Sequence, residues 1–101
     1  MSERDIDVLN ILWGHKEPMQ AMDIAYAGKG LNQSTVTSVL RKLLAREMVE
    51  VVGITQSGKV LSRVYRPTKA SKKAVIDYML EKLKRCENVV TLEDLQRAQQ
   101  A

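Results

Sequence analysis

Residues 32–65 read NQSTVTSVLRKLLAREMVEVVGITQSGKVLSRVY, a helix-forming run that passes directly into two segments rich in β-branched residues. Asn32 is a favourable N-cap, because its side-chain oxygen can accept a hydrogen bond from an otherwise unpaired amide one turn later. At about 100° per residue, one narrow side of the helix is mostly apolar. The residues predicted to face the core on this side are Val36, Leu40, Leu43, Leu44 and Glu47.

The opposite side of this helix is polar, with small hydroxyls at its start and cations at its end. Its members are Ser34, Thr35, Ser38, Arg41, Lys42, Ala45 and Arg46, with Thr37 on the flank. A helix that enters the DNA major groove with its N-terminus first needs short polar side chains near the base edges and cations that reach phosphates or guanine. The pattern favours a DNA-reading helix. The alternative is an ordinary amphipathic helix whose outer face is only hydrated.

The two segments after the helix predict a β-hairpin over residues 49–55 and 60–65. The intervening Gln56-Ser57-Gly58-Lys59 places a glycine in the turn. Lys59 and Arg63 put positive charge on and beside this hairpin, together with Arg66. A basic hairpin directly after a reading helix is typical of a wing that grips the DNA backbone, where contacts set register without reading sequence. We also expect the hairpin to cover part of the core.

Positive charge is concentrated in the same region. Residues 32–73 contain nine Lys or Arg and two Asp or Glu, a local net charge of +7, whereas the whole chain carries +4. A concentrated positive field attracts a polyanion, because binding releases its condensed counterions. The alternative on charge alone is a solvated basic face.

Helical patterns flank this region on both sides. A first helix is expected to begin with the capping pair Ser2 and Asp5 and to end near Trp13. A short second helix is expected over residues 22–27, closed by glycines. Beyond Pro67, Thr68 is expected to cap a helix that runs to residue 85 or 86.

A final short helix is predicted from a Thr91 cap, with Asp94 completing a capping box. We therefore divide the chain into a DNA-binding domain, 1–67, and a C-terminal helical segment, 68–101. The apolar stripes of this tail make it the candidate for pairing two subunits, since symmetric dimers commonly bind two-fold operators. The alternative is a tail folded back on its own domain.

Other classes of function find little support in the composition. A chain of 101 residues is expected to form one modest core, and the absence of a long apolar run favours a cytoplasmic protein without membrane contact. Cys86 is the single cysteine and His15 the single histidine, and no acidic cluster has metal-ligand spacing. We therefore expect no enzyme activity, no metal and no cofactor.

Several ordered motifs resemble the penicillinase repressor (BlaI/MecI) family, over roughly residues 4 to 83. They are Val8-Leu9-Asn10-Ile11-Leu12-Trp13, the run from Ser34 to Leu43, and Tyr65-Arg66-Pro67. The resemblance implies a dimeric winged-helix repressor of bacterial operators. It also implies that Trp13 anchors the first helix in the core and that Lys59 and Arg63 lie on or beside the wing. The implied groove-facing residues are Ser34, Thr35, Thr37 and Ser38, with Thr35 and Thr37 as the base readers.

The chain departs from that family in ways that limit the resemblance. It contains no phenylalanine with which to build the cleavage motif of the antibiotic-responsive members, so release by proteolysis is not carried over. Cys86 alone does not supply the paired cysteine motifs of the copper-responsive members. Thr37 replaces a longer basic residue of some relatives, so the operator is not carried over either.

Together these patterns predict a mainly α fold with a small β-hairpin, in which a winged helix-turn-helix precedes a helical dimerisation tail. The predicted function is a sequence-specific, DNA-binding transcriptional regulator, a repressor that binds a palindromic operator in double-stranded DNA as a homodimer. The alternative is a winged-helix protein interaction module without specific DNA binding. No inducing partner follows from the sequence.

Overall fold

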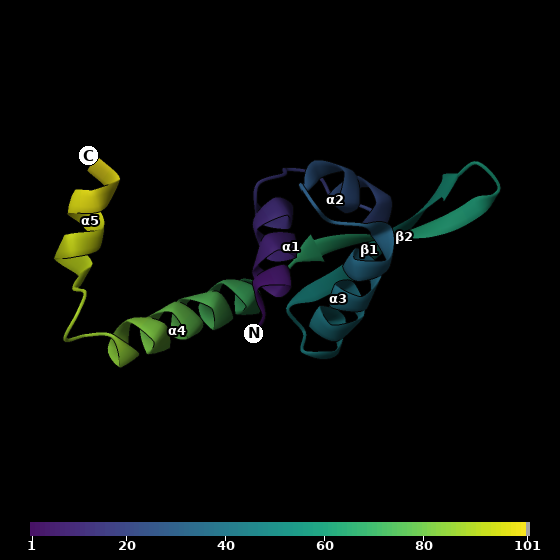
Figure 1. The fold of residues 1–101 in the computed structure, drawn as a ribbon. Coiled ribbons are helices and arrows are strands. Elements are labelled where there is room, and N and C mark those ends of the chain that lie inside the picture. Colours follow the sequence, from purple (N-terminus) through teal and green to yellow (C-terminus); the bar gives the residue numbers. More distant parts are fainter. Residues whose placement is uncertain (101) are drawn as a thin grey trace.

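Five helices and one β-hairpin make up the computed structural model, which describes residues 1–100 (Figure 1). In chain order the elements are α1 (Glu3–Trp13), α2 (Ala21–Ala27), α3 (Gln33–Ala45), β1 (Val49–Ser57), β2 (Val60–Pro67), α4 (Lys69–Arg85) and α5 (Leu92–Gln100). The mainly helical class and the position of the hairpin are as predicted. The strands extend two residues beyond their predicted ends, and α2 begins one residue earlier.

Local capping explains where the helices begin. Ser2 and Asp5 form the predicted capping box, in which the Asp5 amide donates to Ser2 Oγ and the Ser2 amide donates to Asp5 Oδ2. The Asn32 side chain accepts from the Thr35 amide at 2.8 Å, as expected for an N-cap. Thr68 precedes α4, but its side chain does not cap it. Its hydroxyl donates instead to the Glu47 carbonyl at 2.7 Å and ties the start of α4 to the α3–β1 turn.

The core lies where α1, α2 and α3 meet the base of the hairpin. Its fully buried side chains include Leu9, Leu12, Ile24, Val36, Leu40, Leu43 and Val49. The predicted inner face of α3 is confirmed at Val36, Leu40 and Leu43, and Leu44 is partly buried against the same core. Glu47 is exposed instead, because α3 ends at Ala45 and Glu47 adopts a positive φ of 60° in the turn that follows.

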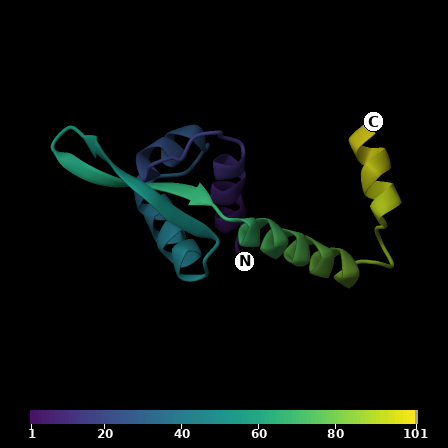
Figure 2. The same ribbon diagram turned by 180° about the vertical axis from the view of Figure 1, so that it is seen from behind.

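The hairpin is antiparallel and joined to the body by a third short segment. Its register pairs Val49 with Pro67 and shifts between Val51 and Gly53. Met19 forms a bridge to Tyr65 through backbone hydrogen bonds of 2.9 and 2.8 Å, so the loop after α1 binds the edge of β2. These contacts fix the base of the hairpin, while its outer half projects beyond α2 and α3 (Figure 2).

The C-terminal helices leave the body on the side opposite the hairpin, which gives the chain extents of 55 × 27 × 23 Å. Both views show α5 well away from α1, α2 and α3, so α5 does not fold back on the body. Thr91 and Asp94 form the predicted capping box at the start of α5, with hydrogen bonds of 3.0 and 3.1 Å.

Trp13 is not the core anchor that the family resemblance implied. It is 45% exposed, because the last turn of α1 lies at the seam with α4 rather than inside the three-helix core. Its indole nitrogen donates to Ser71 Oγ at 3.0 Å, and Ser71 in turn donates to the Thr68 carbonyl. The Lys72 ammonium lies 5.5 Å from the centre of the indole ring. Trp13 therefore orients α4 on the body.

Candidate nucleic-acid interface

The outer face of α3 begins just after Asn32, which ends the loop after α2 and caps the helix. Its first two turns line a shallow surface hollow formed by Gln33, Ser34, Thr37, Ser38 and Arg41. All five are exposed, and all except Arg41 have short or uncharged polar ends. The N-terminal half of α3 therefore offers hydroxyl, amide and guanidinium groups on one accessible surface, the set that hydrogen-bonds to base edges.

The predicted site residues differ in how freely they face solvent. Ser34, Thr37, Ser38, Arg41, Arg46, Lys59 and Arg63 are exposed. Thr35 is partly buried and stands outside the hollow, with its amide held by Asn32. Gln33, which the sequence patterns did not single out, lies inside the hollow. Helical spacing alone could have predicted its position, because residues four apart on a helix are neighbours and Gln33 therefore lies beside Thr37.

Lys42 is held by an acidic residue of the body. Its ammonium lies 2.7 Å from Asp5 Oδ1, and the Asp5 side chain is only 1% exposed. Burial by itself raises the pKa of Asp5, but the Lys42 ammonium and the hydrogen bonds from Ser2 outweigh it, so the pKa lies below its ordinary value. The ion pair joins the start of α1 to the last turn of α3 and so fixes the orientation of the outer face.

We expect Asp5→Asn to destabilise the fold by about 1–3 kcal/mol, since it leaves the partly buried Lys42 without its counter-charge. Because the folded pKa of Asp5 is lowered, the carboxylate stabilises the fold at neutral pH, and this contribution is lost as the pH falls below about 4. Urea unfolding between pH 3 and 7 measures both effects. Asp7→Asn is the matched control, because Asp7 forms only an exposed ion pair with Arg4. Equal stability losses in the two variants would contradict the expectation.

The other cations among the predicted site residues form no ion pair with a carboxylate of residues 1–100. These cations are Arg41, Arg46, Lys59 and Arg63, whereas Arg66 is paired with Glu50 across the hairpin. Arg41 lies on α3 and Arg46 caps its C-terminal end, and the other two cations lie on the wing. Their charges are therefore available to a polyanion without the cost of breaking an existing pair.

Solved structures show which known fold this arrangement shares. A PadR family transcription regulator from Clostridium difficile matches with a TM-score of 0.61 and 17% identity, over 87% of this chain and 94% of that one. The structure of hsRosR-S1 matches at 0.62 and 18%, over 99% and 87%. The PcaV transcriptional regulator from Streptomyces coelicolor, solved with its natural ligand, matches at 0.63 and 17%, over 100% and 76%. This chain has the winged-helix fold.

Comparisons of sequence add no closer relative. No family model matches the chain, and no curated protein matches it. The narrower likeness to the penicillinase repressors therefore rests on the sequence motifs alone. Over residues 1–100, no helix combines the length and apolar composition needed to cross a bilayer, and no three His, Cys, Asp or Glu side chains are grouped to hold a metal ion.

Proposed function

We propose that this protein is a cytoplasmic transcriptional regulator that binds a two-fold operator in duplex DNA as a homodimer and represses transcription. The observation that carries the proposal is the exposed polar and basic face of α3 with an equally exposed basic wing after it. Winged-helix transcription regulators share this fold, which supports the assignment. Within that class we place the chain nearest the penicillinase repressors, on the strength of its sequence motifs.

Each part of the interface has a distinct role in this proposal. The N-terminal half of α3 enters the major groove, where Ser34, Thr37 and Ser38 meet base edges or thymine methyls and Arg41 reaches guanine or phosphate. Arg46 and the wing cations bind the backbone and set register. Thr35 and Lys42, the remaining predicted contacts, act mainly by supporting α3, because one is partly buried and the other is held by Asp5.

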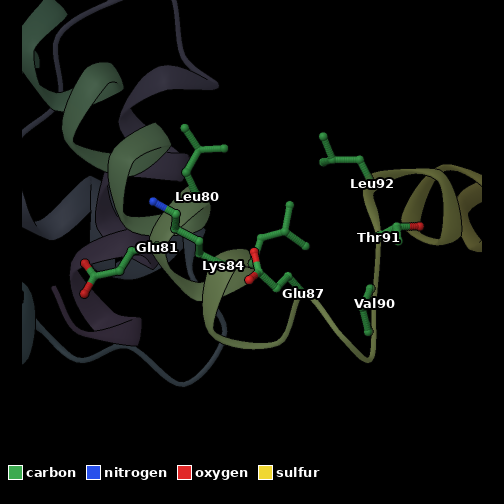
Figure 3. Close-up of a pocket in the computed structure, with 8 residues that line it drawn as sticks. Leu80, Glu81, Lys84, Glu87, Val90, Thr91 and Leu92 are labelled. Atoms are coloured by element: carbon green, nitrogen blue, oxygen red, sulfur yellow. The ribbon is translucent and has the colours of Figure 1, made fainter.

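The proposed dimer forms through the C-terminal helices. The exposed large apolar side chains of these helices and of the segment between them are Ile76, Met79, Leu80, Val89, Leu92 and Leu95. Leu80 and Leu92 lie on opposite sides of an open hollow at the α4–α5 corner, which Val90 also lines (Figure 3). An apolar surface of this kind on a single chain marks an interaction site, and a second copy of the tail supplies matching apolar residues.

We expect duplex DNA to bind with an affinity that falls steeply as salt rises, with a logarithmic slope near −0.9 per phosphate neutralised. Thr37→Ala is expected to cost about 1–3 kcal/mol on the preferred sequence and little on random DNA, because it removes a base contact. Lys59→Ala should weaken both DNAs alike and reduce the slope by about one. Fluorescence anisotropy at several salt concentrations measures all three quantities.

The rival assignment is a winged-helix module that binds proteins rather than specific DNA. A flat salt response, or no binding even at low salt, would favour that rival. If Thr37→Ala and Lys59→Ala acted identically on preferred and random duplexes, the division between groove and backbone contacts would be wrong. Repression itself is tested by a reporter gene placed behind the selected operator, whose expression should rise when the protein carries Thr37→Ala.

A further inference from the structure

The outer half of the hairpin exposes large apolar side chains to solvent. Ile54 is 67% exposed, Val60 65% and Leu61 70%. Both ribbon views show this part of the hairpin extending past the body without another element of residues 1–100 beside it. A wing that only gripped phosphates would need no large aliphatic side chains, so these residues require a different explanation.

The strand register shows that Ile54 and Leu61 lie on a continuation of the core-facing side. Side chains alternate between the two faces of a strand, so Leu61 and Arg63 lie on the same face as Tyr65, which packs against the core. Ile54 pairs with Arg63 and therefore lies on the same face. At the base of the hairpin this face also carries the buried Val49, whose partner Pro67 stands two residues from Tyr65. The apolar face thus runs past the edge of the body.

The charge around this face identifies the kind of partner. Lys59 lies in the turn and Arg63 lies on the face itself, and both are exposed. The sequence from 51 to 65 contains no Asp or Glu. An apolar surface whose charged neighbours are all cations fits a partner that offers negative charge at its rim and apolar stacked rings inside. The minor groove of DNA, with its phosphate walls and base steps, has this chemistry.

We propose that the wing enters the minor groove beside the operator half-site and presses Leu61, with Ile54 behind it, against a base step so that the duplex bends. This inference rests on the proposed DNA-binding function. The minor groove is about 6 Å wide, so a ribbon of two strands enters it at its tip, near which Leu61 lies. Apolar wedges of Leu or Ile partly unstack such steps and kink the duplex by about 20–90°. Arg63 gains from the strong negative potential of the groove.

The test uses a duplex selected by the full-length protein from a random pool, with dyes at its two ends. A second version carries inosine for guanine in the flanks, which removes the 2-amino group from the minor groove and leaves the major-groove edge unchanged. The native protein is expected to bend both duplexes, seen as higher energy transfer between the dyes. It should bind the inosine version about threefold or more tightly, because the amino group obstructs the wedge.

Leu61→Ser is expected to weaken binding by about tenfold, to abolish the bend and to remove the preference for inosine. Ile54→Ser should act in the same direction. Val60→Ser is the matched control: Val60 is similarly exposed but lies on the other face, since it alternates with Leu61. All three side chains are outside the core, so thermal unfolding of the variants should match the native protein.

The outcomes distinguish a failure of the proposed wedge from a failure of the proposed DNA-binding function. Failure to select any duplex would overturn both. A selected duplex that binds equally well with inosine or guanine and stays straight would contradict the wedge but not the proposed DNA-binding function. An equal loss of bending in Val60→Ser would contradict the assignment to one face. If Leu61→Ser changed self-association and not bending, the face would be a protein contact and the inference would be wrong.

Discussion

Leu80→Asp combined with Leu92→Asp is expected to convert the protein to a monomer and to lower its affinity for a two-fold operator by about 10²- to 10⁴-fold. The loss is large because a dimer binds its second half-site at high effective concentration, and a monomer forfeits that advantage. The two leucines line opposite sides of the hollow at the α4–α5 corner and are each about half exposed. A carboxylate buried in an apolar dimer interface would cost several kcal/mol.

Sedimentation velocity measures the oligomeric state, and anisotropy on full and half operators measures the affinity. Asn88→Asp is the matched control for each of the two substitutions made alone, because it adds the same single negative charge to the exposed segment between α4 and α5 without removing apolar surface. The native chain sedimenting as a monomer at high concentration would count against the role of the tail. So would a double variant that remained a dimer.

Substitution tests this role better than removal of the whole tail. Ser71 is fully buried, and Val75 packs against the core, although both lie beyond the proposed boundary at residue 67. Trp13 also donates a hydrogen bond to Ser71. A chain ending at Pro67 would therefore lose contacts of the folded body together with the dimer surface.

The starts of α1, α3 and α5 were predictable, because the groups that cap each of these helices lie within three residues of one another. Ser2 with Asp5 and Thr91 with Asp94 form their boxes through local backbone hydrogen bonds that the sequence alone encodes. The same local logic failed at Thr68. Its hydroxyl bonds to Glu47, 21 residues earlier, and a contact of that separation exists only once the hairpin has brought both ends together.

The candidate site was predictable as a face of α3 but not residue by residue. Helical periodicity separates inner from outer positions, and Thr37 and Arg41 lie outside as expected. Periodicity does not show which residues of other elements contact the sides of the helix. Lys42 contacts Asp5 because the start of α1 packs beside the last turn of α3, and the tertiary packing of those two helices decides that contact. The orientation of Trp13 likewise depends on α4.

Leu43→Ala is expected to reduce the free energy of unfolding by about 2–5 kcal/mol, a large share of the stability of a domain this small. Leu43 is fully buried in α3 among side chains of α1, α2 and β1, so truncation leaves a cavity that its neighbours fill only partly. Leu61→Ala is the matched control, since the same change at a side chain 70% exposed should cost less than about 1 kcal/mol.

Urea unfolding followed by circular dichroism measures both variants, and equal losses would show that the core is centred elsewhere.

The comparison also bears on function. Leu43 lies opposite the hollow, and the reading face of α3 keeps its position only while the inner face is packed. Leu43→Ala should therefore weaken DNA binding at temperatures where the native protein is fully folded, and the added ligand should restore its stability by mass action. Leu61→Ala should instead weaken binding at every temperature with little change in unfolding, because its side chain belongs to the proposed DNA contact and not to the core.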